Sequence, residues 1–97
     1  MPAFVSLMKF SDQGIKNIKE APDRIQDAFR NVEKMGGKII NFYAVWGEYD
    51  YVAISEFPSE EIATAFILKL GSLGNVKSTT LRAFTVDEFT EIVKKIP

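Results

Sequence analysis

The sequence has 97 residues, enough for one domain with an ordinary core and too few for two. Apolar residues make up 46% and charged residues 26%, which is typical of a globular domain, and no apolar run reaches the roughly 18 residues of a membrane helix. The formal net charge is -1 with both signs scattered along the chain, so nothing indicates binding to a nucleic-acid backbone.

The chain contains neither cysteine nor histidine. These absences exclude a disulfide framework, a thiolate nucleophile and an imidazole base, and they remove the two commonest ligands of transition metals. We therefore expect no metal site and no cofactor. Met1-Pro2-Ala3 leads into a strand-like run without a basic leader, which predicts a cytoplasmic protein.

The first half of the chain predicts a strand followed by a helix. Residues 3–10 form a β-rich run that is apolar on both faces, and the cluster Ser11-Asp12-Gln13-Gly14 indicates a turn. Residues 15–21 are too short a pattern to classify. Pro22 suits the first turn of an amphipathic helix, which Gly36-Gly37 ends.

Two further strands form a predicted hairpin. Residues 38–46 and 49–57 alternate in polarity, and Gly47-Glu48 between them indicates a two-residue turn in which glycine takes a positive φ. The pattern places Val52 and Ile54 on one face of the second strand, and Tyr49 and Tyr51 on the other.

The last third predicts a helix, a strand and a short final helix. Ser59 is the expected N-cap of the first helix, and residues 76–84 form the strand. Thr85 and Glu88 match a capping box for the final helix. The expected packing face of that helix consists of Phe89, Ile92, Val93 and Ile96.

The order of elements predicts an α+β fold with the ferredoxin-like βαββαβ plan in a single domain over residues 1–97, followed by the C-terminal helix. Helices cover one face of such an antiparallel sheet, and the other face meets water, a ligand or a partner. From the alternation of residues we expect this open face to carry Phe4, Ser6, Met8, Asn41, Tyr43, Tyr49, Tyr51, Thr80 and Arg82. So many aromatic residues favour a homodimer or higher homo-oligomer joined through these faces.

Several stretches resemble the GYD domain family, small proteins named for a Gly-x-Tyr-Asp pattern. The pattern itself is Gly47, Tyr49 and Asp50. Further similarity lies in Ser11-Asp12-Gln13-Gly14-Ile15, Phe42-Tyr43, Leu73-Gly74-Asn75-Val76 and residues 79–85, so it covers almost the whole chain. The resemblance implies a dimeric α/β-barrel and no established activity.

The leading hypothesis for function is binding of a small anionic or aromatic molecule in a cleft at the interface between two sheets. Arg82 would offer a bidentate fork, and the three tyrosines a stacking surface. The expected ligand-binding residues are Tyr43, Tyr49, Tyr51, Thr80 and Arg82. The alternative is structural: the tyrosines fill the interface, and Arg82 pairs with a carboxylate such as Glu48 or Asp50.

Two further alternatives concern chemistry and architecture. In the structural alternative, Asp50 accepts backbone hydrogen bonds from the turn at residues 12–14 or from the one at residues 74–75. In the catalytic alternative, Asp50 serves as the base of a metal-free enzyme that acts on a small substrate by acid–base chemistry, like an oxygenase or an isomerase. The chain can also be a purely structural interaction module. RNA binding is disfavoured because the third strand lacks the basic start of RNA-recognition motifs.

Overall fold

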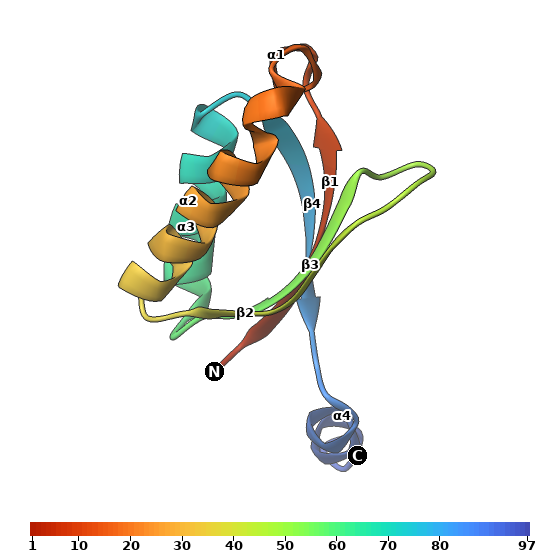
Figure 1. The fold of residues 1–97 in the computed structure, drawn as a ribbon. Coiled ribbons are helices and arrows are strands. Elements are labelled where there is room, and N and C mark those ends of the chain that lie inside the picture. The colour runs from red at the N-terminus through yellow and green to blue at the C-terminus, as the bar shows by residue number, and fades with distance from the viewer.

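The structure, a computed structural model, describes every residue from Met1 to Pro97. Its sheet has the order β2-β3-β1-β4, with every neighbouring pair antiparallel. Helices α2 and α3 cover one face of the sheet, and the other face is uncovered (Figure 1). This confirms the predicted ferredoxin-like α+β plan. The elements are β1 (Ala3–Phe10), α1 (Asp12–Lys16), the 3-10 helix η1 (Ile18–Glu20), α2 (Ala21–Lys34), β2 (Lys38–Ala44), β3 (Tyr51–Glu56), α3 (Glu60–Ser72), β4 (Val76–Ala83) and α4 (Val86–Val93).

Local signals in the sequence account for the boundaries of the covering helices. Pro22 lies in the first turn of α2, and Gly36, with φ of 82°, follows its C-terminal end. Ser59 caps α3, because its Oγ accepts a hydrogen bond from the backbone N–H of Ile62 at 3.2 Å. These three predictions are confirmed.

The segment after β1 is helical, and the turn predicted at Ser11-Asp12-Gln13-Gly14 is wrong. Ser11 caps α1 by accepting a hydrogen bond from the N–H of Gly14 at 3.0 Å, and its hydroxyl donates to the carbonyl of Gly74. A serine cap followed by Asp12 favours a helix even though Gly14 weakens it. The short helix is thereby tied to the loop that precedes β4.

The connection between β2 and β3 is longer than the predicted two-residue turn. β2 ends at Ala44 and β3 begins at Tyr51, and the loop is closed by a bond of 2.9 Å from the N–H of Val45 to the carbonyl of Asp50. Gly47 does take the expected positive φ, 104°. The loop extends beyond the sheet on its uncovered side (Figure 1).

The core lies between the sheet and the helices, and the predicted sides of β1, β3 and β4 are reversed. Phe4 and Met8 of β1 are buried under the helices, as are Tyr51 and Ala53 of β3. β1 is apolar on both faces, so its alternation did not reveal which face the helices cover. The larger aromatic side chains take the covered face, where more apolar area is removed from water.

A β-bulge between Ile39 and Asn41 also changes the alternation of β2. Because one extra residue is inserted there, Ile39 and Phe42 both pack toward the helices while Tyr43 is exposed. Simple alternation along residues 38–46 would place Ile40 on the same face as Phe42, and this is wrong because of the bulge.

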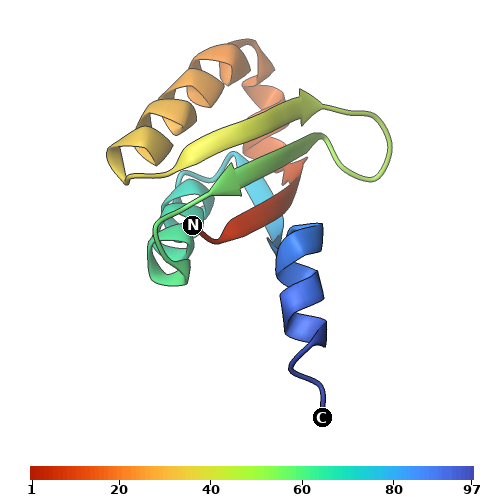
Figure 2. The same ribbon diagram turned by 90° about the horizontal axis from the view of Figure 1, so that it is seen from below.

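Helix α4 forms with the predicted capping box but does not pack as expected. Thr85 and Glu88 bond each other's backbone N–H groups at 3.1 and 3.0 Å. The helix lies apart from the two layers (Figure 2), beyond the lower end of β4 in Figure 1. Its apolar residues Phe89, Ile92, Val93 and Ile96 are exposed.

Candidate functional site

The uncovered face of the sheet, here called the open face, is apolar along its middle. Its position follows from the strand register, since each residue alternates with one buried under the helices. None of its large apolar side chains is fully buried, and nothing in the chain covers them. The apolar residues of the open face are Val5, Leu7, Val52, Ile54 and Leu81.

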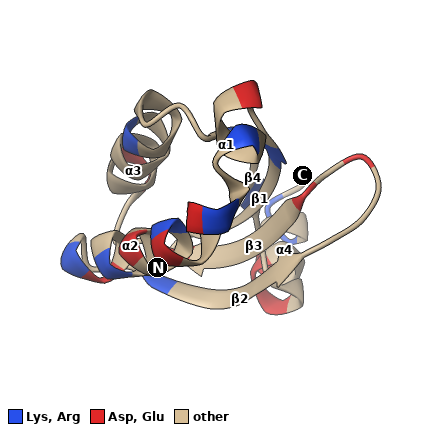
Figure 3. Cartoon of the chain, turned by 45° about the horizontal axis from the view of Figure 1, so that its top comes forward, with Lys and Arg blue, Asp and Glu red and all other residues tan.

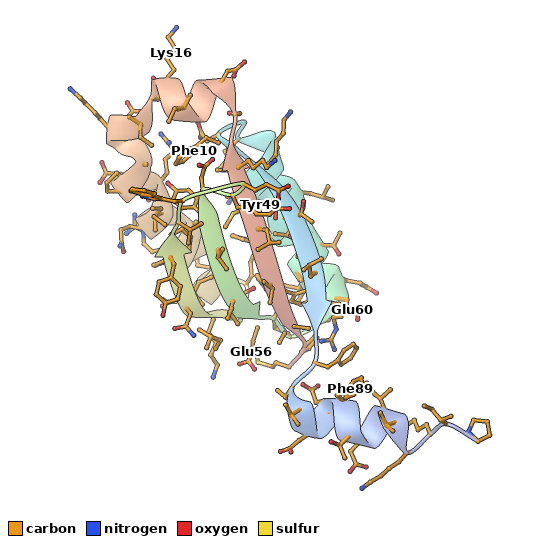
Figure 4. The ribbon with its side chains drawn as sticks, turned by 90° about the vertical axis from the view of Figure 1, so that its right-hand side faces the viewer. Phe10, Lys16, Tyr49, Glu56, Glu60 and Phe89 are labelled. Carbon is orange, nitrogen blue, oxygen red and sulfur yellow. The ribbon has the colours of Figure 1, made fainter.

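Charges lie at the two ends of the open face. Lys9 and Lys77 are register partners at one end, where the Nζ of Lys9 lies 5.4 Å from the centre of the Tyr49 ring and 4.0 Å from Glu48. Glu56 lies at the opposite end from Tyr49 (Figure 4). In Figure 3 the middle parts of β2 and β3 carry no charged residue. The open face therefore has an apolar centre, with Lys9 and Lys77 beside Glu48 at one end and Glu56 beside its register partner Lys38 at the other.

The loop of residues 45–50 carries Trp46 at its exposed part. The Trp46 side chain is 100% exposed. An indole in full contact with water buries none of its large apolar surface, and tryptophan is among the residues most enriched at binding hot spots. This residue was not singled out from the sequence, although a lone tryptophan beside a turn glycine was the available signal.

Asp50 joins the loop to β1. Its Oδ2 accepts a hydrogen bond from the N–H of Phe10 at 2.9 Å, and its own N–H donates to the carbonyl of Met8 at 2.8 Å. The predicted acceptor role for backbone N–H groups is confirmed, but the donor is Phe10 and not the segments at residues 12–14 or 74–75. The motif residue Tyr49 lies against Lys9 on the open side.

The five predicted ligand-binding residues do not come together. Tyr43 lies on the open side of β2 and Tyr49 on the loop, whereas Tyr51 is buried under the helices and only 7% exposed. Thr80 also lies on the covered side, where its hydroxyl is 3.3 Å from that of Ser6 and 2.7 Å from that of Ser78. The predicted positions of Tyr51, Thr80 and Arg82 on the open face are therefore wrong.

Arg82 is held at the end of β4 by its own chain. Its Nε lies 3.2 Å from a carboxylate oxygen of Glu60, and its guanidinium donates to the carbonyls of Ala3 and Ala83. The guanidinium carbon also lies 4.5 Å from the centre of the Phe84 ring. Pairing with a carboxylate is confirmed, but the partner is Glu60 instead of Glu48 or Asp50.

Two titratable groups are shifted by their surroundings. Burial raises the pKa of Tyr51, so its phenol stays protonated over a wider pH range. The hydrogen bond from the Thr85 backbone lowers the pKa of Glu88 in the capping box. No three acidic side chains gather as a metal site would require, and no helix is long and apolar enough to span a bilayer.

Comparison with known proteins identifies the family of the chain. The chain is 32% identical over 95 residues to the glutamine synthetase and cystathionine beta-lyase binding protein of Thermus thermophilus, a match that covers 97% of this chain and all of that protein. Residues 4–93 match the GYD domain, with Gly47, Tyr49 and Asp50 inside the matched range. The chain therefore belongs to the GYD domain family.

Proposed function

We propose that the protein is a self-associating interaction module that packs its open face against a second copy of the chain and, as an assembly, binds metabolic enzymes. The observation that carries the proposal is the uncovered apolar stripe of Val5, Leu7, Val52, Ile54 and Leu81. A contiguous apolar surface on one face of a sheet costs free energy in water and is relieved when another surface covers it.

The arrangement of charges favours a second copy as the cover. A twofold axis that crosses the strands stacks two open faces with opposite strand directions. The end with Lys9, Lys77 and Glu48 then faces the end with Glu56 and Lys38 of the other copy, so that each charged group has an opposite charge available across the interface. Charges that meet their opposites fix the register of an interface and disfavour other arrangements.

The same axis also pairs the two other uncovered apolar features. Helix α4 lies beyond one end of the open face, and the loop with Trp46 extends at the other (Figures 1 and 4). Reversing one copy relative to the other brings α4 of one beside the Trp46 loop of its partner. Phe89 and its neighbours on α4 are exposed within their own chain, as is Trp46. In this arrangement Trp46 of one copy packs against Phe89 and its neighbours of the other.

The relative named as a glutamine synthetase and cystathionine beta-lyase binding protein supports the enzyme-binding part. Members of one family at this similarity keep their fold, and an interaction module needs no catalytic group, in keeping with a chain that lacks cysteine and histidine. We propose that the partners of this chain are enzymes of the same two kinds.

Light scattering tests self-association. The wild-type chain should give twice the 10.9 kDa mass of one chain, and Val52→Asp should give the single mass because it places a charge in the centre of the open face. The control is Leu68→Asp, an exposed apolar position on α3, which should keep the doubled mass. A wild-type monomer at micromolar concentration would rule self-association out.

Enzyme binding is tested separately with immobilised wild-type protein and purified glutamine synthetase or cystathionine beta-lyase from the source organism. Saturable retention of either enzyme supports the proposal. If neither is retained while light scattering shows the doubled mass, the partner assignment is wrong and self-association stands.

The ligand cleft at the interface, the metal-free enzyme and the cytoplasmic location stay predictions. Of the five residues expected in the cleft, only Tyr43 and Tyr49 lie on the open side, and the cation beside Tyr49 is Lys9 in place of Arg82. A ligand held between two open faces would therefore meet these three side chains.

A further inference from the structure

A cavity of about 330 Å³ lies between the sheet and the two covering helices. Its volume falls within the range of about 300 to 1,000 Å³ seen for pockets that hold small organic molecules. Most of its lining is apolar, from α2, α3 and the covered face of the sheet. The cavity is on the side of the sheet opposite to the open face and is separate from the proposed interface.

Small side chains in the central strands create the cavity. Ser6 of β1 is the register partner of Ala53 in β3, so the middle of the covered face carries little bulk under the helices. Large residues stand on either side, with Tyr51 and Met8 toward one end and Phe66 toward the other. The hollow is thus specified by the sequence at two adjacent positions.

The walls include stacked aromatic rings. The ring centres of Phe42 and Tyr51 are 5.0 Å apart, and those of Phe29 and Phe42 are 5.5 Å apart with the planes at 75°. All three rings line the cavity. Aromatic walls favour flat aromatic guests, which gain edge and face contacts beyond simple burial.

Two hydroxyl groups at the cavity have no partner in the chain. Ser55 and Tyr51 are both more than nine-tenths buried, yet neither side chain makes a hydrogen bond, whereas Ser6 is paired with Thr80. No polar side-chain atom that is sealed from solvent lacks a partner, so these two hydroxyls reach open space, and both residues line the cavity. Such groups fix the orientation of a guest that offers a carbonyl or hydroxyl.

The cationic groups at the cavity are already engaged. The guanidinium of Arg24 donates to the carbonyls of Asn17 and Gly14 at 2.8 and 3.2 Å, and Lys69 donates to Asn31 at 3.3 Å. A carboxylate inside would lose its hydration without gaining a free cation, which is costly in an apolar site. The bond between Lys69 and Asn31 is the one side-chain hydrogen bond between α2 and α3, which cover the same face of the sheet (Figure 1).

We propose that this cavity binds a small neutral aromatic molecule that carries a carbonyl or hydroxyl group, with Ser55 and Tyr51 as its hydrogen-bonding partners. The guest enters between α2 and α3, where the Lys69–Asn31 bond spans the rim. Its binding does not depend on self-association.

Calorimetric titration with 2-naphthol, and with 2-naphthoate as the charged compound of similar shape, tests the proposal. 2-Naphthol should bind one molecule per chain, at least about tenfold more tightly than 2-naphthoate, since the anion loses its hydration. Ala53→Leu should abolish binding by filling the hollow. Ser55→Ala, which removes one hydroxyl and little volume, should weaken binding about two- to tenfold.

The matched control is Thr79→Ala, on the same sheet but on the open side, which should leave the affinity unchanged. Absence of saturable 2-naphthol binding to the wild-type protein overturns the proposal. So does a Ser55→Ala variant with unchanged affinity, a result that stays informative if Ala53→Leu does not fold. Val52→Asp must also bind as the wild type does, because loss in that variant would place the probe between two open faces.

Discussion

The carboxylate of Asp50 accepts a hydrogen bond from the backbone N–H of Phe10, with 2.9 Å between Oδ2 and N. Phe10 is the last residue of β1 and Asp50 the last residue of the loop before β3. The bond therefore attaches the start of one central strand to the end of the other. It gives the third motif position of the family a structural role that needs no catalysis.

Removal of this acceptor should destabilise the fold. Asp50→Ala should lower the free energy of unfolding by about 1.5 to 3 kcal/mol, the range for hydrogen bonds to charged groups. Asp50→Asn keeps an acceptor oxygen and should cost less than half as much. Urea unfolding followed by circular dichroism measures both, and equal losses in the two variants would contradict the assigned role.

A second prediction concerns the close approach of α1 to the loop before β4. A Cβ on Gly14 would collide with the backbone carbonyl of Asn75, which also accepts a bond from the N–H of Ser11 at 3.0 Å. Gly14→Ala should therefore cost about 2 kcal/mol or more, since two backbone segments must separate. Gly71→Ala in α3 meets no atom within 4 Å and is the control.

The control should change stability in the opposite direction. Alanine has a higher helix propensity than glycine, by up to about 1 kcal/mol in a helix interior, so Gly71→Ala should stabilise slightly. Thermal unfolding of both variants checks the pair. Similar effects of the two substitutions would mean that space around Gly14 is not the reason for glycine there.

The sequence predicted the order of the four strands with α2, α3 and α4, though not α1 or η1, because most of these boundaries carry a local signal. Ser59, Thr85 with Glu88 and Gly36 act through contacts within a few residues, which the chain specifies directly. The length of the loop after Ala44 was harder to predict, since a glycine with positive φ suits both a two-residue turn and the longer loop observed.

The sequence could not show which face of the sheet the helices cover. The position of the candidate site depends on that face and could not be predicted either. Phe4 and Val5 are both apolar, so the alternation in β1 permits either face to be covered by the helices. One wrong choice assigns every residue of the strand to the opposite face. The bulge after Ile39 has no clear signature in the sequence. Tyr51 was consequently expected at an interface, while Val52 beside it, which lies on the open face, was expected in the core.

The buried phenol of Tyr51 predicts a pH dependence of stability. Burial raises its pKa in the folded state, while in the unfolded chain the group ionises near 10.0. Stability from this residue is complete below pH 10 and is lost as pH rises toward the folded pKa, because only the unfolded state then releases the proton. Tyr51→Phe should lack this loss.

The measurement compares the unfolding free energies of the wild type and Tyr51→Phe between pH 8 and pH 11. The other ionisable groups are the same in both proteins, so their contribution cancels in the difference. The wild type should lose more stability than the variant across this range. Parallel pH profiles would show that the phenol is as accessible as a free tyrosine.

The last prediction concerns contact between α4 and the Trp46 loop of the second copy. Trp46 is 100% exposed and Phe89 59% exposed in the single chain, so Trp46 contributes no packing within it and Phe89 leaves most of its surface uncovered. Phe89→Ser and Trp46→Ala should each raise the dissociation constant of the dimer by about tenfold or more, as loss of a buried aromatic anchor does. Neither should change the unfolding of the monomeric Val52→Asp background.

A double-mutant cycle decides whether the two residues touch. Sedimentation equilibrium should give a combined loss smaller than the sum of the single losses, since each substitution alone already removes the shared contact. Lys94→Gln, which affects only the exposed pair with Glu91 at 2.9 Å, should leave the dissociation constant within about twofold. Strictly additive losses would show that α4 and the loop contact different parts of the partner, and the twofold axis across the strands would be wrong.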